Sequence, residues 1–165
     1  MSKLDSINIS PTYTVKIPST KQTVQFRPYS VKEEKALLAA DMSGDGIVMI
    51  KTLLQVVQNC LTPSPKKLTG FDLEYLFAQI RAHSVGEIAS IRVGCDAAGC
   101  EDVSIEYRYD IRDIKVVFPD GYDDLIRIND KLAIKMAHPS VEQSIEIEQA
   151  GDSADQRYLA VAAAL

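Results

Sequence analysis

The hydrophobic pattern between residues 69 and 94 restricts the possible folds more than any other feature of this sequence. Its first part has apolar residues at the i, i+3, i+4, i+7 spacing of one helix face: Leu73, Leu76, Phe77 and Ile80. Thr69 and Asp72 have the spacing of a capping box at the start of this helix, and Gly86 suits a left-handed stop at its end. The pattern then alternates with a period of two. It therefore predicts a helix over 71–85 followed by a β-strand.

The rest of the chain alternates between the same two periods. A second capping box at Ser30 and Glu33 opens a helix, and another helix covers about 47–61 with a narrow polar stripe. A helix-prone segment follows His138. Alternating, β-branched segments predict strands at 13–17, 23–27, 88–93, 103–109, 116–118, 125–128 and 131–136. We therefore expect an α+β fold: an N-terminal β-hairpin, a three-helix segment, a mostly antiparallel sheet and a C-terminal helix.

Length and charge limit the domain count and the partners. With 165 residues the chain is long enough for one domain, which we place at 12–165 after a loose N-terminal arm at 1–11. A net charge of −5 gives no electrostatic footprint for nucleic acid. We expect no membrane span, because no apolar run reaches 18 residues, and no signal peptide at 1–5. Three cysteines indicate a reducing compartment.

Two cysteines form the only motif in the sequence that resembles a metal-binding site. Cys95 and Cys100 lie five positions apart on a predicted turn, and Gly99 permits a tight backbone there. This is half of a zinc ribbon, because structural zinc takes four ligands. Cys60 or His83 could complete a site only if the fold brings them close. Three alternatives stay open: a turn without metal, a zinc ion bound within this chain, and a zinc ion shared with a partner or with further C-terminal sequence.

The sequence predicts no catalytic residues and no cofactor site. Cys60 lies on the apolar side of its helix and is interpreted as a buried small hydrophobe. His83 and His138 have no serine or paired carboxylates at a catalytic spacing. The phosphate-loop, Gly-x-Ser-x-Gly and His-Glu-x-x-His patterns are also missing from the sequence. We therefore expect a protein that is not an enzyme.

The amino-acid sequences of two segments resemble those of a known family. Residues 26–35 (FRPYSVKEEK) and 71–87 (FDLEYLF, then RA and SVGE) resemble, in the same order, the signatures of a baseplate hub assembly protein family of contractile-tailed, myovirus-type bacteriophages. The resemblance covers roughly residues 10–118 well. It implies a virion-assembly protein, a hub subunit or an assembly chaperone, that contacts other baseplate hub or tail proteins. It also implies a location in the host cytoplasm during assembly or in the tail baseplate.

Further expectations follow from this resemblance. The polar positions Glu33–Lys35, Glu74 and Arg81 become candidates for contacts with hub or wedge subunits. Members of the family continue further and commonly carry another cysteine pair near the C-terminus. Since residues 158–165 look like the middle of a helix, we expect the chain to be truncated or shorter than its relatives. The alternative function, from another class, is a small zinc-ribbon-like adaptor that binds metal and a protein partner.

Overall fold

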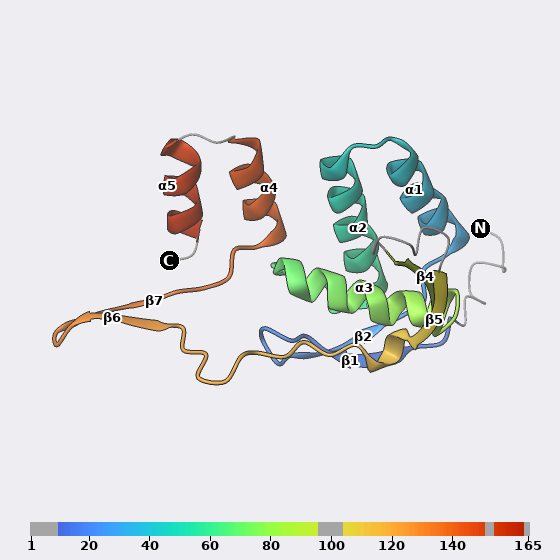
Figure 1. Ribbon diagram of the computed structural model, residues 1–165, viewed down its shortest axis with the longest axis horizontal. Helices are drawn as coiled ribbons and strands as arrows, with labels where there is room; N and C mark the ends of the chain where they lie inside the picture. The colour runs from blue at the N-terminus through green and yellow to red at the C-terminus, as the bar shows by residue number, and fades with distance from the viewer. Residues whose placement is uncertain (1–9, 96–103, 151–153, 164–165) are drawn as a thin grey trace, which may run out of the picture.

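A computed structural model describes residues 10–95, 104–150 and 154–163 of the protein (Figure 1). These residues adopt the expected α+β fold, with the N-terminal hairpin, the three-helix segment and a helical C-terminal part. The elements are β1 (Tyr13–Lys16), β2 (Thr23–Phe26), α1 (Val31–Met42), α2 (Gly46–Cys60), β3 (Leu61–Thr62), α3 (Gly70–Ser84), β4 (Ile88–Gly94), β5 (Ser104–Asp110), the 3-10 turn η2 (Ile111–Asp113), β6 (Leu125–Asn129), β7 (Leu132–Lys135), α4 (Val141–Gln149) and α5 (Ala154–Ala163). Residues 1–9 of the predicted arm lie outside the described residues, as do residues 164–165 at the end of the chain.

The first sheet consists of the N-terminal hairpin and one short strand. β1 and β2 pair antiparallel with Val15 opposite Val24, so these two side chains lie on the same face of the hairpin, and both are buried. β3 joins the sheet by pairing Leu61 with Phe26. The sequence did not predict β3, since two residues are too few to show a period.

Capping side chains set the helix boundaries. The Thr69 hydroxyl accepts a hydrogen bond from Asp72 N, and the Asp72 carboxylate accepts one from Thr69 N, so the predicted capping box of α3 is formed. Gly86 follows the helix with φ = 140°, which favours glycine. Between α1 and α2, Asp45 Oδ1 accepts from Ile47 N at 2.8 Å and caps the second helix.

One hydrophobic core lies between the first sheet and helices α1, α2, α3 and α4. α1 and α2 lie side by side, and α3 crosses their ends (Figure 1). The stripe that the sequence predicts on α3 is turned into this core: Leu73, Leu76 and Ile80 are buried, and Phe77 packs against them half-buried. Each such buried aliphatic side chain stabilises the fold by about 1.5–3 kcal/mol. α4 joins the same core through Val141 and Ile145.

The strands after α3 pair antiparallel as expected, but as two separate hairpins and not as one sheet. β4 pairs with β5, and β6 pairs with β7. The predicted strand at 116–118 is absent from the described residues, which have no strand between β5 and β6. Phe118 instead packs edge-to-face on Phe71 at 5.9 Å between ring centroids. Aromatic packing, not strand pairing, holds this segment.

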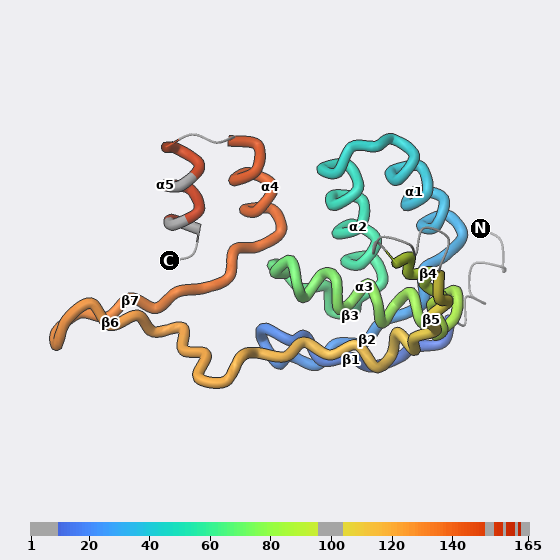
Figure 2. The backbone as a smooth tube through the Cα atoms, in the orientation of Figure 1, coloured from blue at the N-terminus to red at the C-terminus, as the bar shows by residue number. Residues whose placement is uncertain are grey.

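The chain path after residue 114 is extended (Figure 2). It runs along the first hairpin, turns, and enters the β6–β7 hairpin, which projects away from the rest of the molecule. The chain then returns at Ser140, which bridges to Thr69, and Val141 N donates to Leu68 O at 2.8 Å. These bonds fix the start of α4 beside the start of α3.

Among the described helices, none has both the length and the apolar character that crossing a lipid bilayer requires.

Candidate functional site

The two family-like segments, residues 26–35 and 71–87, meet in space. Tyr29 N donates a hydrogen bond to Ser84 Oγ at 3.0 Å, and the rings of Tyr29 and Phe77 stack with centroids 6.4 Å apart. Phe26 contacts His83 at 5.2 Å in an edge-to-face arrangement. The distinctive residues therefore pack against one another between β2, the segment before α1, and α3. They form a structural junction.

An ion pair ties three elements together at this junction. The Arg27 guanidinium donates to both oxygens of Glu33, at 2.9 and 2.7 Å, and also to Asn59 O at 3.3 Å near the end of α2. The hydrogen bonds from Arg27 lower the pKa of Glu33 from 4.5 to about 2. The Glu33 side chain is only 13 % exposed, and its ion pair with Arg27 stabilises the packing of α1 against the end of β2. Arg27 binds this carboxylate within the chain, and the expected contact of Glu33 with another subunit stays a prediction.

Asp72 forms a second stabilising connection between distant segments, and this one is buried. The residue is 1 % exposed, and its carboxylate accepts from Ser19 N at 2.9 Å and Ser19 Oγ at 2.5 Å. It also accepts from Thr69 Oγ1 at 2.7 Å. A buried carboxylate is tolerated when hydrogen bonds satisfy it, as they do here. Asp72 thus connects the turn of the first hairpin to the start of α3, a contact across 53 residues of sequence.

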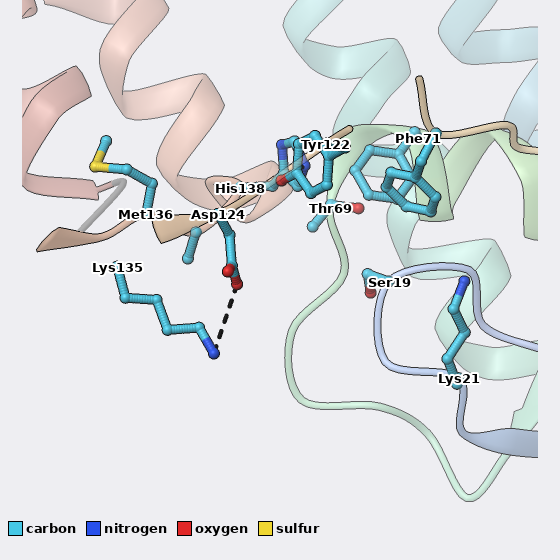
Figure 3. A pocket seen from close by; sticks show the side chains of 11 residues that line it. Ser19, Lys21, Thr69, Phe71, Tyr122, Asp124, Lys135, Met136 and His138 are labelled. Atoms are coloured by element: carbon cyan, nitrogen blue, oxygen red, sulfur yellow. Dashed lines mark hydrogen bonds and ion pairs between the residues drawn. The ribbon is translucent and has the colours of Figure 1, made fainter. Parts of the chain in front are cut away.

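Aromatic rings line a groove of about 440 Å³ beside this connection (Figure 3). Phe71 packs edge-to-face against His138 at 5.0 Å, and Phe118 contacts Tyr122 at 5.5 Å. Tyr122 Oη and His138 Nε2 are 3.0 Å apart. Lys21 Nζ lies 5.0 Å from the centroid of the Phe118 ring, in cation–π contact. The groove thus has apolar ring faces, and its charged lining residues are Lys21, Lys135 and Asp124.

The hairpin of β4 and β5 carries an apolar face that is exposed. Ile91 lies opposite Tyr107 and Val93 opposite Ile105, and these side chains are 52, 58, 57 and 68 % exposed respectively. The alternate positions carry polar groups, such as Arg92 opposite Glu106 and Ser90 opposite Arg108. Isolated two-stranded hairpins are marginal in water. Exposed apolar faces of this kind are common at surfaces that bind other proteins.

Comparison with known proteins supplies the family. Residues 10–163 match the family described as T4 bacteriophage base plate protein. The chain belongs to this phage baseplate family. No curated protein sequence and no solved structure matches it. The resemblance of residues 26–35 and 71–87 is thus confirmed at the level of a baseplate protein.

The predicted metal ligands of this baseplate protein are only partly placed. Cys95 is exposed and follows β4, whereas Cys100 lies outside the described residues. Cys60 is 1 % exposed in the core, and burial raises the pKa of its thiol to about 11, as the interpretation of a small hydrophobe requires. His83 packs between Tyr13 and Phe26. Across the described part of the chain, no three His, Cys, Asp or Glu side chains gather as a metal site.

The two histidines have structural surroundings. His83 Nδ1 lies 2.8 Å from Gln79 O on its own helix, and the His83 ring is 4.1 Å from the ring of Tyr13. His138 stacks on Tyr122 at the aromatic groove. Among the described residues, these two rings contact aromatic rings, the Tyr122 hydroxyl and the Gln79 carbonyl. The baseplate family indicates a structural role, and the packing of both histidines agrees with that role.

Sequence reasoning missed two features of this surface. Phe71 and His138 are 67 positions apart, and no local pattern indicates that they share a groove. Ser19 is part of a predicted turn, and nothing there signals its bonds to Asp72. The alternation in the sequence, by contrast, predicts that β4 and β5 have one apolar face. It does not predict that this face is exposed.

Proposed function

We propose that this chain is a non-enzymatic baseplate hub subunit or assembly chaperone that acts through contacts with other hub or tail proteins. The family match over residues 10–163 carries the proposal, because it places the chain among baseplate proteins. The contact surface that we assign is the apolar face of the β4–β5 hairpin, defined by Ile91, Val93, Ile105 and Tyr107.

The energetics of that face support the proposal. Burying an apolar side chain against a partner removes it from water and contributes about 25 cal/mol per Å². Among the described residues β4 and β5 pair only with each other, so their outer edges can extend a partner's sheet. In a protein that assembles with others, a partner covers such a face, whereas in a protein that works alone the exposed face promotes aggregation.

Co-purification from phage-infected cells tests the proposal. A tagged chain should capture baseplate hub proteins, identified by mass spectrometry, and a variant with Ile91→Asp and Tyr107→Asp should lose them. Arg108→Ser, on the opposite face of the same hairpin, is the matched control and should retain them. Circular dichroism verifies that each variant is folded. The contact surface is wrong if the doubly substituted chain captures the same hub proteins as the wild type.

Finished virions separate the two roles. A hub subunit remains in purified particles and is detected there by mass spectrometry. An assembly chaperone is present in the infected cell and missing from the particles.

A further inference from the structure

Two aspartates of this chain directly precede a glycine: Asp45 before Gly46, and Asp120 before Gly121. An aspartate in this position isomerises without an enzyme, because glycine has no side chain to hinder attack of its backbone nitrogen on the carboxyl carbon. The reaction needs a carboxyl group that is free to turn toward that nitrogen and a backbone that can follow it. The structure separates the two aspartates on both requirements.

The carboxylate of Asp45 is held by the start of α2. Asp45 Oδ1 accepts hydrogen bonds from Ile47 N at 2.8 Å and from Val48 N at 3.2 Å. Gly46 is the first residue of α2, so its backbone has the conformation of the helix. Attack of Gly46 N on the Asp45 carboxyl therefore requires the N-cap of α2 to break.

The carboxylate of Asp120 has no such restraint. Asp120 and Gly121 are both exposed, and in the part of the chain that the structure describes neither the Asp120 carboxylate nor Gly121 N forms a hydrogen bond. The two residues are the central pair of a turn that one bond closes, from Tyr122 N to Pro119 O at 3.1 Å. Gly121 has φ = 76°, as the third residue of a type II turn does. A surface turn with a single closing bond reorients at a lower cost than the start of a helix.

We propose that Asp120 is a site of spontaneous isomerisation to isoaspartate. Gly121 N attacks the side-chain carboxyl carbon of Asp120, a carbon–nitrogen bond forms, and the carboxyl hydroxyl leaves with the amide proton as one water molecule. The product is a succinimide ring. One water molecule then opens the ring: cleavage at the side-chain carbonyl restores aspartate, and cleavage at the main-chain carbonyl gives isoaspartate. The water released equals the water consumed, so no cofactor or oxidant takes part.

The isomerised backbone changes the aromatic groove. Isoaspartate adds one methylene group to the main chain between Pro119 and Gly121, so the bond that closes the turn loses its geometry. The rings on either side of this turn, Phe118 and Tyr122, lie 5.5 Å apart and both line the groove, where Tyr122 lies beside His138 (Figure 3). Isomerisation therefore moves the Tyr122 ring relative to those of Phe118 and His138.

Incubation of the full chain in water enriched in the heavy oxygen isotope tests the inference, because each opening of a succinimide places one labelled oxygen on that residue. Peptide mass spectrometry locates the label, and electron-transfer fragmentation separates isoaspartate from aspartate. In the folded chain Asp120 should take up label at least about fivefold faster than Asp45, the factor that corresponds to roughly 1 kcal/mol for a helix N-cap. In urea the two sites should be labelled at similar rates, because the N-cap is absent there.

Asp120→Glu is the matched variant, because it keeps the charge at this exposed position but would have to close a larger ring. It should stop the modification at position 120 and leave the slow labelling of Asp45 unchanged. NMR spectra of the aged wild-type chain should contain a second set of Tyr122 and His138 resonances whose intensity follows the isoaspartate fraction. Spectra of the aged Asp120→Glu chain should contain a single set.

Equal labelling of Asp45 and Asp120 in the folded chain would overturn the inference, since the structure would then not select the site. A chain that contains isoaspartate at position 120 but has one unshifted set of Tyr122 resonances would overturn the effect on the groove. The modification is independent of the β4–β5 face, so Asp120→Glu chains should capture hub proteins as the wild type does. Failure of this inference and failure of the proposed function therefore give different results.

Discussion

Replacing Glu33 with Gln removes the charge from the best-defined ion pair of the fold. Two hydrogen bonds join Arg27 to Glu33, and Ser30 N also donates to Glu33 Oε2 at 2.7 Å. These bonds lower the pKa of Glu33 from 4.5 to about 2 in the folded protein. The full shift corresponds to roughly 3 kcal/mol at 1.36 kcal/mol per pKa unit. Since the Arg27 side chain is 36 % exposed and solvent screens the pair, we expect a loss of about 1–2 kcal/mol at pH 7.

The sign of the pH dependence follows from the direction of the shift. A carboxyl whose pKa is lower in the folded state stabilises that state at pH values above its unfolded pKa of 4.5. This contribution is lost as the pH falls from 4.5 toward 2. The stability difference between wild type and Glu33→Gln should therefore be largest near neutral pH and shrink through this window.

Urea denaturation, followed by circular dichroism at a series of pH values, measures that difference. Glu74→Gln, on the exposed face of α3, is the matched control and should change the free energy of unfolding little at any pH. The reasoning is refuted if Glu33→Gln is as stable as the wild type at pH 7. It is equally refuted if the difference between the two chains stays constant while the pH falls.

Three further predictions concern buried groups and metal. Asp72→Ala should lower the free energy of unfolding by about 2–4 kcal/mol in urea titrations, because the donors of Ser19 and Thr69 lose their acceptor in a buried site. If Asp72→Ala lowers the free energy of unfolding no more than Ser19→Ala does, the role of Asp72 in connecting the first hairpin to α3 is contradicted. In a Cys95→Ser, Cys100→Ser chain, Cys60 should react with iodoacetamide only after unfolding, since its thiol is buried with a pKa of about 11; rapid labelling of the folded chain would show that α2 opens readily. Metal analysis of the purified chain should find less than one zinc per chain, because a closed zinc site takes four ligands; one zinc per chain that disappears on Cys95→Ser would instead support the zinc-ribbon-like adaptor.

Local signals in the sequence predicted the elements well. The capping boxes at Ser30 and Thr69 and the stop at Gly86 act within a few residues, so the boundaries of α1 and α3 are close to those expected. The apolar stripe of α3 likewise predicted the buried face, because a helix with one apolar side turns it toward the core. The two family-like segments could be recognised for the same reason, since each is continuous in sequence.

Contacts between distant segments could not be predicted in this way. Phe118 alternates like a strand residue, yet its ring packs on Phe71, which is distant in sequence and which no local pattern connects to it. Within the described residues the strands after α3 form two separate two-stranded hairpins. The alternation of β4, β5, β6 and β7 could not predict this arrangement, because the same alternation occurs whether or not one face is covered by another sheet. The Cys95–Cys100 motif remains a prediction, because the second cysteine lies outside the described residues.

Complementation of a phage that lacks this gene tests the central claim most directly. The claim is that the chain is needed to build the baseplate and acts through the apolar face of its β4–β5 hairpin. Electron microscopy of lysates should show no complete baseplates without the gene, and the wild type and Arg108→Ser should restore them. The chain with Ile91→Asp and Tyr107→Asp should fail to restore them while remaining folded. Normal baseplates in the absence of the gene, or full rescue by the doubly substituted chain, would contradict the account.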